Sequence, residues 1–362
     1  MKQGWEKIPF EDSIVKVKYT TKILSNDYLE QGVYPIVSQE EGLISGYWNN
    51  EDDVFKIASP VVIFGDHTRI LKYVDFDFVL GADGVKILQP IDCIKAKFLK
   101  LYLESCKIPS LGYSRHYKLL KELQIPVPPL SEQEKIVAEL DCLSGIIEKK
   151  KQQLKELDAL AESIFYTMFG DPITNEKGWE VKKIKDVAPQ QEYKGNVPCV
   201  DGKYWLLNLD MIIPNTGEII EKCYFDYDEI GNSTIIFNTD NVLYSKLRPY
   251  LNKVVIPNDV GYGTSELVPL KPHKDLLNKV FFASLLRSSY FVKYISTKVA
   301  GAKMPRVAMG EFREFEVILP PFVLQQEFAD KIEAIEKQKE LIKQSITETE
   351  ELFNSRMDYY FG

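Results

Sequence analysis

The chain has 362 residues, of which 45% are hydrophobic and 12% aromatic, and this length predicts two domains with well-packed cores. Its formal net charge of −8 argues at first against a nucleic-acid partner, but most of the excess acid lies in segments 123–174 and 315–362, so the two larger segments are nearly neutral. The scattered cysteines, the few histidines and the lack of any long uncharged apolar run argue against a disulfide framework, a metal site and a membrane span, so we expect a cytoplasmic protein.

The sequence contains an internal repeat. "GWEKIPFED" near the start returns as "GWEVKKIKD" at Gly178–Asp186, and "VPPL" at Val127–Leu130 returns as "LPPF" at Leu319–Phe322. The two copies end in "MFG" and "YFG". Because several anchors recur in the same order, we expect two globular units and two long helices. The predicted boundaries are 1–122 for the first unit, 123–174 for its proline segment and helix, 175–314 for the second unit, and 315–362 for the second proline segment and helix.

Each globular unit is predicted to be mixed α/β, with more strand than helix. Segments rich in β-branched and aromatic residues, interrupted by Gly, Asp and Asn, predict the strands. Trp5 and Trp179 open the two copies and are predicted to be core residues, whereas "GYGTSE" at Gly261–Glu266 is predicted to form a turn. The predicted strands lie at 60–65, 76–90, 203–209, 241–247 and 252–257, and the predicted helices at 94–107 and 276–297.

A long helix is predicted after each proline segment. Ser131 should be the N-cap of the first, with Glu134 reaching back in a capping box. Apolar residues then recur at alternating steps of four and three, which predicts a coiled coil of about five heptads. Each helix should have roughly 37 residues and a length of about 55 Å, and Gly170 should end the first. Since the first helix leads into the second unit, which leads into the second helix, we expect an antiparallel pair with a pseudo-twofold axis and one unit at each end.

These features resemble the specificity subunit of type I restriction–modification systems. The resemblance covers the whole chain and depends on two units that begin near Gly-Trp-Glu, each followed by a proline segment such as "IPVPPLSEQEKI" (Ile125–Ile136) and a heptad helix closed by Phe-Gly. The second copy, "PPFVLQQEF", keeps both prolines and Gln325 but has Val323 and Leu324 in place of Ser131 and Glu132.

The resemblance implies a non-catalytic subunit that binds double-stranded DNA. Each globular unit would be a target-recognition domain that reads one half of a split sequence. The helices would set the spacing between the halves and dock two methyltransferase subunits, joined by two restriction subunits where these are present. The chain itself would bind no cofactor or metal, because S-adenosylmethionine, ATP and Mg would belong to the partner subunits, which carry out adenine methylation and cleavage.

Candidate DNA-contacting residues lie in polar loops of both units. Lys and Arg can bind phosphates or guanine, Asn can pair with adenine, and hydroxyls can bond the DNA backbone. In each case the alternative is an ordinary loop with solvated charges. The candidates of the first unit are His67, Thr68, Arg69, Arg115, His116 and Lys118, with Tyr113 in the same loop as Arg115. Those of the second unit are Ser245, Lys246, Arg248, Asn252, Lys253, Lys303 and Arg306.

Other functions are less well supported. The sequence lacks the amino-methyltransferase, phosphate-loop, hydrolase and zinc-protease motifs, so we expect no catalytic residues. A protein–protein scaffold, with two end domains that grip other proteins and a coiled-coil spacer, stays open because the globular units are nearly neutral. Lys149, Lys150 and Lys151 on the first helix could be a solvated face or part of a docking surface.

Overall fold

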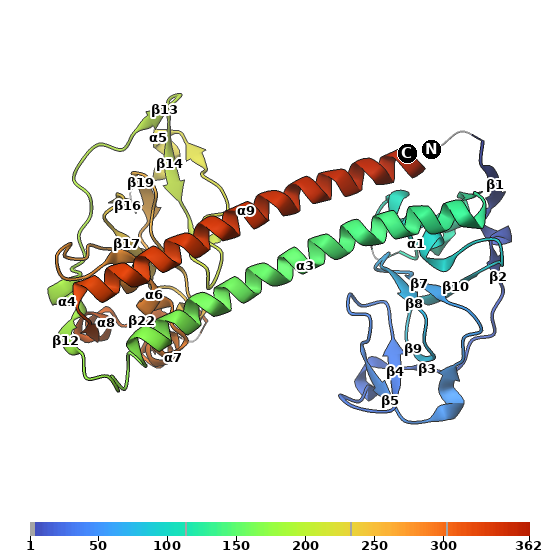
Figure 1. Cartoon of the computed structure of the whole chain (residues 1–362), viewed down its shortest axis with the longest axis horizontal. Coiled ribbons are helices and arrows are strands. Elements are labelled where there is room, and N and C mark those ends of the chain that lie inside the picture. The colour runs from blue at the N-terminus through green and yellow to red at the C-terminus, as the bar shows by residue number, and fades with distance from the viewer. Residues whose placement is uncertain (1–3, 113, 232–233, 302) are drawn as a thin grey trace. The chain divides into compact units, whose positions relative to one another are not determined.

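The computed structural model describes residues 4–112, 114–231, 234–301 and 303–362. The chain forms two compact units, residues 1–150 with 344–362 and residues 151–343. Each unit contains one globular domain and part of both long helices, α3 (Leu130–Phe169) and α9 (Phe322–Phe361) (Figure 1). No helix within the described ranges has both the length and the apolar character of a membrane span.

The first domain is built from two larger sheets, a two-stranded pair and two helices. The first sheet has the order β2-β10-β7-β8, and the second has the order β3-β9-β4-β5, with β6 also paired to β9. The strands are β1 (Glu6–Pro9), β2 (Ile14–Val15), β3 (Lys22–Ile23), β4 (Tyr34–Val37), β5 (Gly46–Trp48), β6 (Val54–Phe55), β7 (Val61–Gly65), β8 (Leu71–Val74), β9 (Phe78–Gly81), β10 (Val85–Pro90) and β11 (Gln124–Val127), and the helices are α1 (Ala96–Ser105) and α2 (Tyr117–Leu120).

The second domain repeats this plan with additions. Its sheets have the orders β18-β17-β20 and β13-β14-β19-β16, with β15 also paired to β14. The strands are β12 (Glu180–Lys183), β13 (Cys199–Val200), β14 (Lys203–Leu207), β15 (Tyr224–Phe225), β16 (Thr234–Phe237), β17 (Val242–Ser245), β18 (Val254–Val255), β19 (Gly261–Thr264), β20 (Leu267–Leu270), β21 (Val299–Ala300), β22 (Arg306–Val307) and β23 (Glu316–Leu319). The helices are α4 (Ile184–Val187), α5 (Tyr227–Ile230), α6 (Lys279–Arg287), α7 (Ser289–Ser296) and α8 (Met309–Glu314).

The proline segments close each domain before the helices begin. In the first domain β11 pairs antiparallel with β1, and in the second β23 pairs antiparallel with β12. The Gly-Trp-Glu copies therefore lead into strands that bind the proline segments. Both tryptophans pack as predicted: Trp5 makes an edge-to-face contact with Phe98, and the indole N–H of Trp179 donates to the carbonyl of Phe169 at 2.9 Å.

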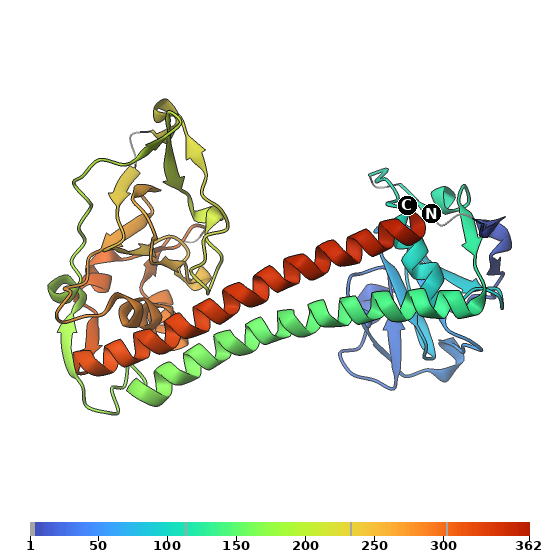
Figure 2. The same cartoon turned by 45° about the horizontal axis from the view of Figure 1, so that its top comes forward.

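Segments of α3 and α9 pair antiparallel within each unit (Figure 2). In the first unit Glu139 contacts Arg356 and Tyr360, and Lys150 contacts Ser345. In the second unit Asp158 pairs with Lys339 at 2.8 Å, and the rings of Phe165 and Phe328 meet edge to face. As the residue number rises along α3 it falls along α9, so the antiparallel prediction is confirmed inside each unit. Both helices have 40 residues, close to the predicted length.

The repeated Phe-Gly ends have a structural reason. The last residue of α9, Phe361, packs against Phe98 of α1, with ring centroids 5.6 Å apart. The last residue of α3, Phe169, packs against Phe281 of α6 at 4.7 Å. Each domain therefore buries the start of the helix that follows it and the end of the other helix. Gly170 closes α3 with φ of +75°, as predicted.

Two predictions about helix ends are wrong. The capping box does not form, because α3 begins at Leu130, which puts Ser131 inside the first turn, and Glu134 pairs with Lys95 at 3.0 Å. The helix predicted at 276–297 is two helices, α6 and α7. Ser288 lies between them with extended backbone, and its hydroxyl accepts the N–H of Phe291 as the N-cap of α7.

Candidate nucleic-acid interface

The structure brings the two candidate loops of the first domain together. Arg69 lies in the turn between β7 and β8, and its Nη1 donates to the carbonyl of Ile108 at 2.9 Å. The carboxylate of Asp66, in the same turn, accepts the N–H of Tyr117 at 2.7 Å. The turn therefore contacts Ile108 and Tyr117, although they are far apart from it in sequence.

A third loop supports this turn. The hydroxyl of Thr68 donates to the carbonyl of Gln39, and the side chain of Gln39 accepts the N–H of His67. Lys72, buried in β8, donates to the carbonyls of Ser38 and Gly42 around that glutamine. Burial lowers the pKa of the Lys72 amine because the core disfavours a cation. The hydrogen bonds to the two carbonyl groups offset part of this cost.

The same arrangement occurs in the second domain. The chain after β17 lies against β22, because the N–H of Arg248 donates to the carbonyl of Pro305 at 2.8 Å and the N–H of Val307 donates to the carbonyl of Lys246 at 2.9 Å. Strands β7 and β17 are equivalent in the two domains. The loop after β7 lies beside the start of α2 in the first domain, and the loop after β17 lies beside the start of β22 in the second. Sequence alone had proposed these loops separately.

The candidate side chains separate into exposed and internal groups. The exposed candidates are Thr68, Arg69, Arg115, Lys118, Lys303 and Arg306, while His67, Lys246 and Arg248 are half-buried. Lys246 donates to the carbonyl of Ser265 at 2.7 Å. Tyr113 lies outside the described residues.

Three of the predicted contacts, His116, Ser245 and Asn252, are corrected because their side chains are buried inside their domains. His116 is fully buried, with Nδ1 bonded to the carbonyl of Asp66 and Nε2 accepting the N–H of Leu111. Ser245 is 3% exposed and donates to Leu247.

Asn252, which is 7% exposed, donates to the carbonyl of Arg287 and has a left-handed backbone. The Lys253 amine donates to the carbonyl of Leu209 at 2.6 Å, and burial lowers its pKa. The side chains of His116, Ser245 and Asn252 therefore lie inside their domains, and the amine of the half-buried Lys253 is bound to a backbone carbonyl.

One side-chain contact in these loops is not predicted by the sequence. Glu266 lies in the turn before β20, and its carboxylate binds the guanidinium of Arg306, with Oε1 2.8 Å from Nη2 and 3.1 Å from Nε. This contact raises the pKa of the Arg306 guanidinium. The signal in the sequence was only the acidic residue that follows the Gly-Tyr-Gly-Thr-Ser run, and its partner lies 40 residues away.

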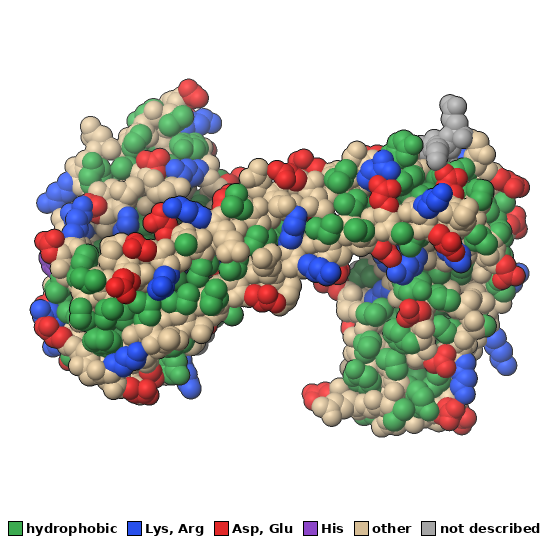
Figure 3. Space-filling view, viewed as in Figure 1, with side chains coloured by type: hydrophobic (Ala, Val, Ile, Leu, Met, Phe, Trp, Pro, Cys, Tyr) green, Lys and Arg blue, Asp and Glu red, His purple; other side chains and the backbone are tan. Residues whose placement is uncertain are grey.

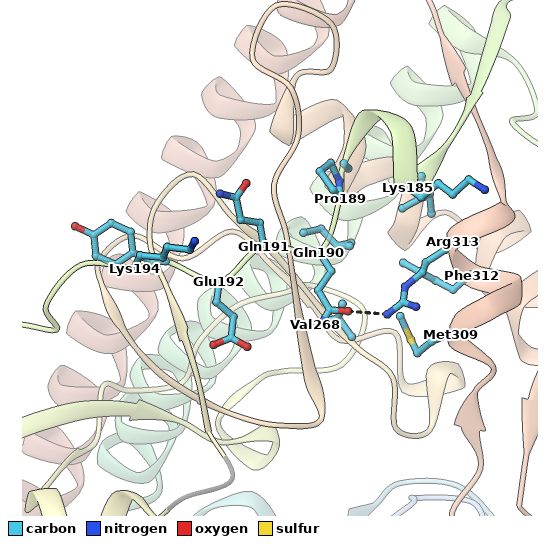
Figure 4. Close-up of a pocket in the computed structure, with 14 residues that line it drawn as sticks. Lys185, Pro189, Gln190, Gln191, Glu192, Lys194, Val268, Met309, Phe312 and Arg313 are labelled. Carbon is cyan, nitrogen blue, oxygen red and sulfur yellow. Dashed lines mark hydrogen bonds between the residues drawn. The ribbon is translucent and has the colours of Figure 1, made fainter.

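The surface charge is mixed. On the face shown in Figure 3, Lys and Arg side chains are interspersed with Asp and Glu over both units. A cavity of about 740 Å³ in the second domain is lined by α4, the segment after it, β20 and α8, where Gln190 accepts a hydrogen bond from Arg313 (Figure 4). None of the candidate DNA contacts lines this cavity, so it is separate from the loop surface.

A comparison with protein families decides the assignment. The family model described as "Type I restriction modification DNA specificity domain" matches residues 2–159 and 176–351, once for each copy of the repeat. The chain belongs to this family. Membership confirms the predicted class of function, DNA specificity in a type I restriction–modification complex, in a subunit that is not the catalytic one.

Curated relatives carry names of the same kind. The chain is 26% identical to the "Type I restriction enzyme MjaIX specificity subunit" of Methanocaldococcus jannaschii, over 72% of this chain and 65% of the relative's length. It is 23% identical to the MjaVIII specificity subunit of the same organism, over 95% of this chain and 90% of that one. The EcoR124I/EcoR124II specificity subunit of Escherichia coli is 22% identical over 96% of this chain and 91% of its own.

Solved structures support the fold. The type I restriction–modification S subunit from M. genitalium aligns with 98% of this chain and 95% of its own, with a TM-score of 0.63 and 13% identity. A chain from a structure described as the basis of "complex assembly" of the type I system aligns with a TM-score of 0.56. At such low identity, these matches establish the two-domain architecture with its long helices and nothing about the DNA sequence.

Proposed function

We propose that this specificity subunit binds double-stranded DNA and that each domain reads one half of a bipartite target. The observation that carries the proposal is the duplicated loop surface: in both domains, two segments with basic side chains are joined by backbone hydrogen bonds at equivalent places in the fold, in the first domain from the N–H of His116 to the carbonyl of Asp66 at 2.9 Å. Loops fixed on a rigid scaffold are where recognition residues are usually found. Arg69, Arg115 and Lys118 would serve one half-site, and Lys246, Arg248, Lys303 and Arg306 the other.

The long helices would set the half-site spacing and dock two methyltransferase subunits. Large apolar side chains remain exposed on them in both units: Leu352 is 49% exposed in the first, and Leu160 and Leu341 are 47% and 66% exposed in the second. Exposed apolar side chains are available for contact with another protein, although singly exposed ones are also common on protein surfaces. Two restriction subunits would join where the host supplies them, and S-adenosylmethionine, ATP and Mg would be bound by the partner subunits.

Domain exchange tests the bipartite proposal. The chain is expressed with its methyltransferase partner, and the methylated sequence is read from the host genome. We expect one bipartite motif with a fixed gap. Replacing residues 1–122 by the corresponding segment of a relative should change one half of the motif and leave the other half and the gap unchanged, because the loop surface of each domain is built from that domain's own residues.

Two outcomes would contradict the proposal. A change in both halves after the exchange would mean that the domains do not read independently. The original chain and the exchanged chain could both bind the methyltransferase and yet produce no bipartite motif. In that case the protein–protein scaffold would be the better description. The reciprocal exchange of residues 175–314 is the matched control and should change only the opposite half.

A further inference from the structure

Arg306 and Glu266 form a bidentate pair at the loop surface of the second domain. Arg306 opens β22 and Glu266 precedes β20. Both Nε and Nη2 of the arginine donate to the carboxylate, with Oε1 3.1 Å from Nε and 2.8 Å from Nη2. The arginine side chain is 48% exposed and the glutamate side chain 21% exposed, so the carboxylate lies beneath the cation.

The carboxylate uses only one edge of the guanidinium. A guanidinium has a side edge, Nε with Nη2, and an end edge, Nη1 with Nη2, each with two parallel N–H groups. Glu266 takes the side edge, and among the described residues no hydrogen bond of Nη1 is found. The end edge has the spacing that fits O6 and N7 of guanine in the major groove.

The two segments that carry the pair are fixed to each other. The N–H of Lys246 donates to the carbonyl of Glu266 at 3.0 Å, and the carbonyl of Lys246 accepts the N–H of Val307 at 2.9 Å. One residue therefore bridges the strand starts on which Glu266 and Arg306 lie. The carboxylate thus holds the guanidinium in a direction that the backbone determines, and less side-chain entropy remains to be lost on binding.

A buttressing carboxylate favours a base over a phosphate as the partner of Arg306. The guanidinium stays protonated, but its ion pair with Glu266 has little net charge, so the attraction of Arg306 for a phosphate is weakened. The O6 and N7 edge of guanine is neutral, so binding to it depends on correctly directed N–H donors more than on net charge. We propose that Glu266 is a positioning residue that presents Arg306 to a guanine in the half-site read by the second domain. This inference rests on the proposed function and adds the class of base that the site reads.

The test measures base preference position by position. Complexes of the full chain with the methyltransferase partner are assayed on duplexes that carry each of the four bases at every position of the second half-site. The variants are Arg306→Lys, which cannot make the bidentate contact, and Glu266→Gln and Glu266→Ala. The control is Glu311→Gln, because Glu311 pairs with Lys298 at 3.4 Å on the same domain, outside the candidate set.

We expect Arg306→Lys to lose discrimination at one guanine by roughly 5- to 150-fold, the range of a bidentate base contact. The two Glu266 variants should lose a smaller factor at the same position, with Glu266→Ala affected more. Preferences in the first half-site should not change, and unchanged preferences at the other positions of the second half-site would show that the second domain still folds. Glu311→Gln should behave as the wild type.

Three results would overturn the inference. A uniform loss over all sequences, with a weaker salt dependence, would make Arg306 a phosphate contact. Unchanged preferences in both Glu266 variants would remove the positioning role, and loss of preference at a base pair without guanine would make the named base wrong. By contrast, a wild-type complex with no bipartite preference would contradict the proposed function itself.

Discussion

Two buried glutamines, Gln133 and Gln325, are the clearest sign of the repeat at the level of single residues. The amide of Gln133 accepts the N–H of Lys95 and donates to the carbonyls of Cys93 and Pro128. Gln325 makes the equivalent bonds with Asn278, Leu276 and Pro320. Both glutamines are fully buried in the first turns of α3 and α9. Each one therefore ties its helix to the segment before α1 or α6 and to the proline segment.

Removing this amide should destabilise the protein. In Gln133→Ala, one N–H and two carbonyl groups lose their bonding partner, and each buried unsatisfied group costs about 1–3 kcal/mol. Because water can enter the space that is left, we expect a total loss of about 2–3 kcal/mol in the free energy of unfolding, measured in urea. The control is Gln152→Ala, whose exposed amide bonds only Glu156 and should change little. Equal effects of the two variants would show that the buried bonds do not matter.

The sequence located the candidate loops better than it located the side chains. Positive charge beside turn residues selected Lys246 and Arg306, whose segments lie together in the second domain and whose contacts with DNA stay a prediction. The same reasoning also selected His116 and Asn252, which are internal. The direction of a loop side chain depends on contacts with segments far away, such as Asp66 for His116 and Arg287 for Asn252. No local pattern contains that information.

At the level of elements, heptad spacing predicted the long helices well but not how they begin. The apolar positions Ile136, Leu140, Phe328 and Ile335 are buried, as the spacing requires. Lys339 occupies a core position and is buried too; its pairing with Asp158 and Glu336 explains why the pattern tolerates it. The start of each helix instead depends on the buried glutamine, a tertiary contact. This explains why the second copy can have Val323 and Leu324 in place of a serine and a glutamate but still has the glutamine, Gln325.

Two glycines of α3 should respond in opposite directions to the same substitution. Gly145 lies inside the helix, with open space where a Cβ would be, so Gly145→Ala should stabilise the protein by about 0.5–1 kcal/mol. Gly170 has φ of +75°, and its Cβ would meet only Lys177 at 3.5 Å, so the cost of Gly170→Ala is conformational, about 1–2 kcal/mol. Thermal unfolding of both variants checks this. A loss of stability in Gly145→Ala would mean that the helix is not continuous there.

At the level of the whole molecule, each helix takes part in both units. Residues 130–150 of α3 and 344–361 of α9 lie in the first unit, and the remaining parts lie in the second. Contacts such as Glu139–Arg356 and Asp158–Lys339 fix the register separately in each unit. Between these two contacts α3 advances by 19 residues and α9 by 17, so the two helices cover nearly the same length there. The lengths of α3 and α9 are therefore coupled.

An insertion of one heptad tests that coupling and the spacing role together. Seven residues added between Gln152 and Gln153 of α3 alone would displace one set of contacts by about 10.5 Å, so both units could not keep their register, and methylation of the native target should be lost. Adding a matching heptad between Lys343 and Gln344 of α9 restores the match in length. The doubly extended chain should be active on targets whose gap is about three base pairs longer, because base pairs stack about 3.4 Å apart. If it still methylated only the original spacing, the helices would not set the gap. If the single insertion were active, the register in the two units would not be coupled.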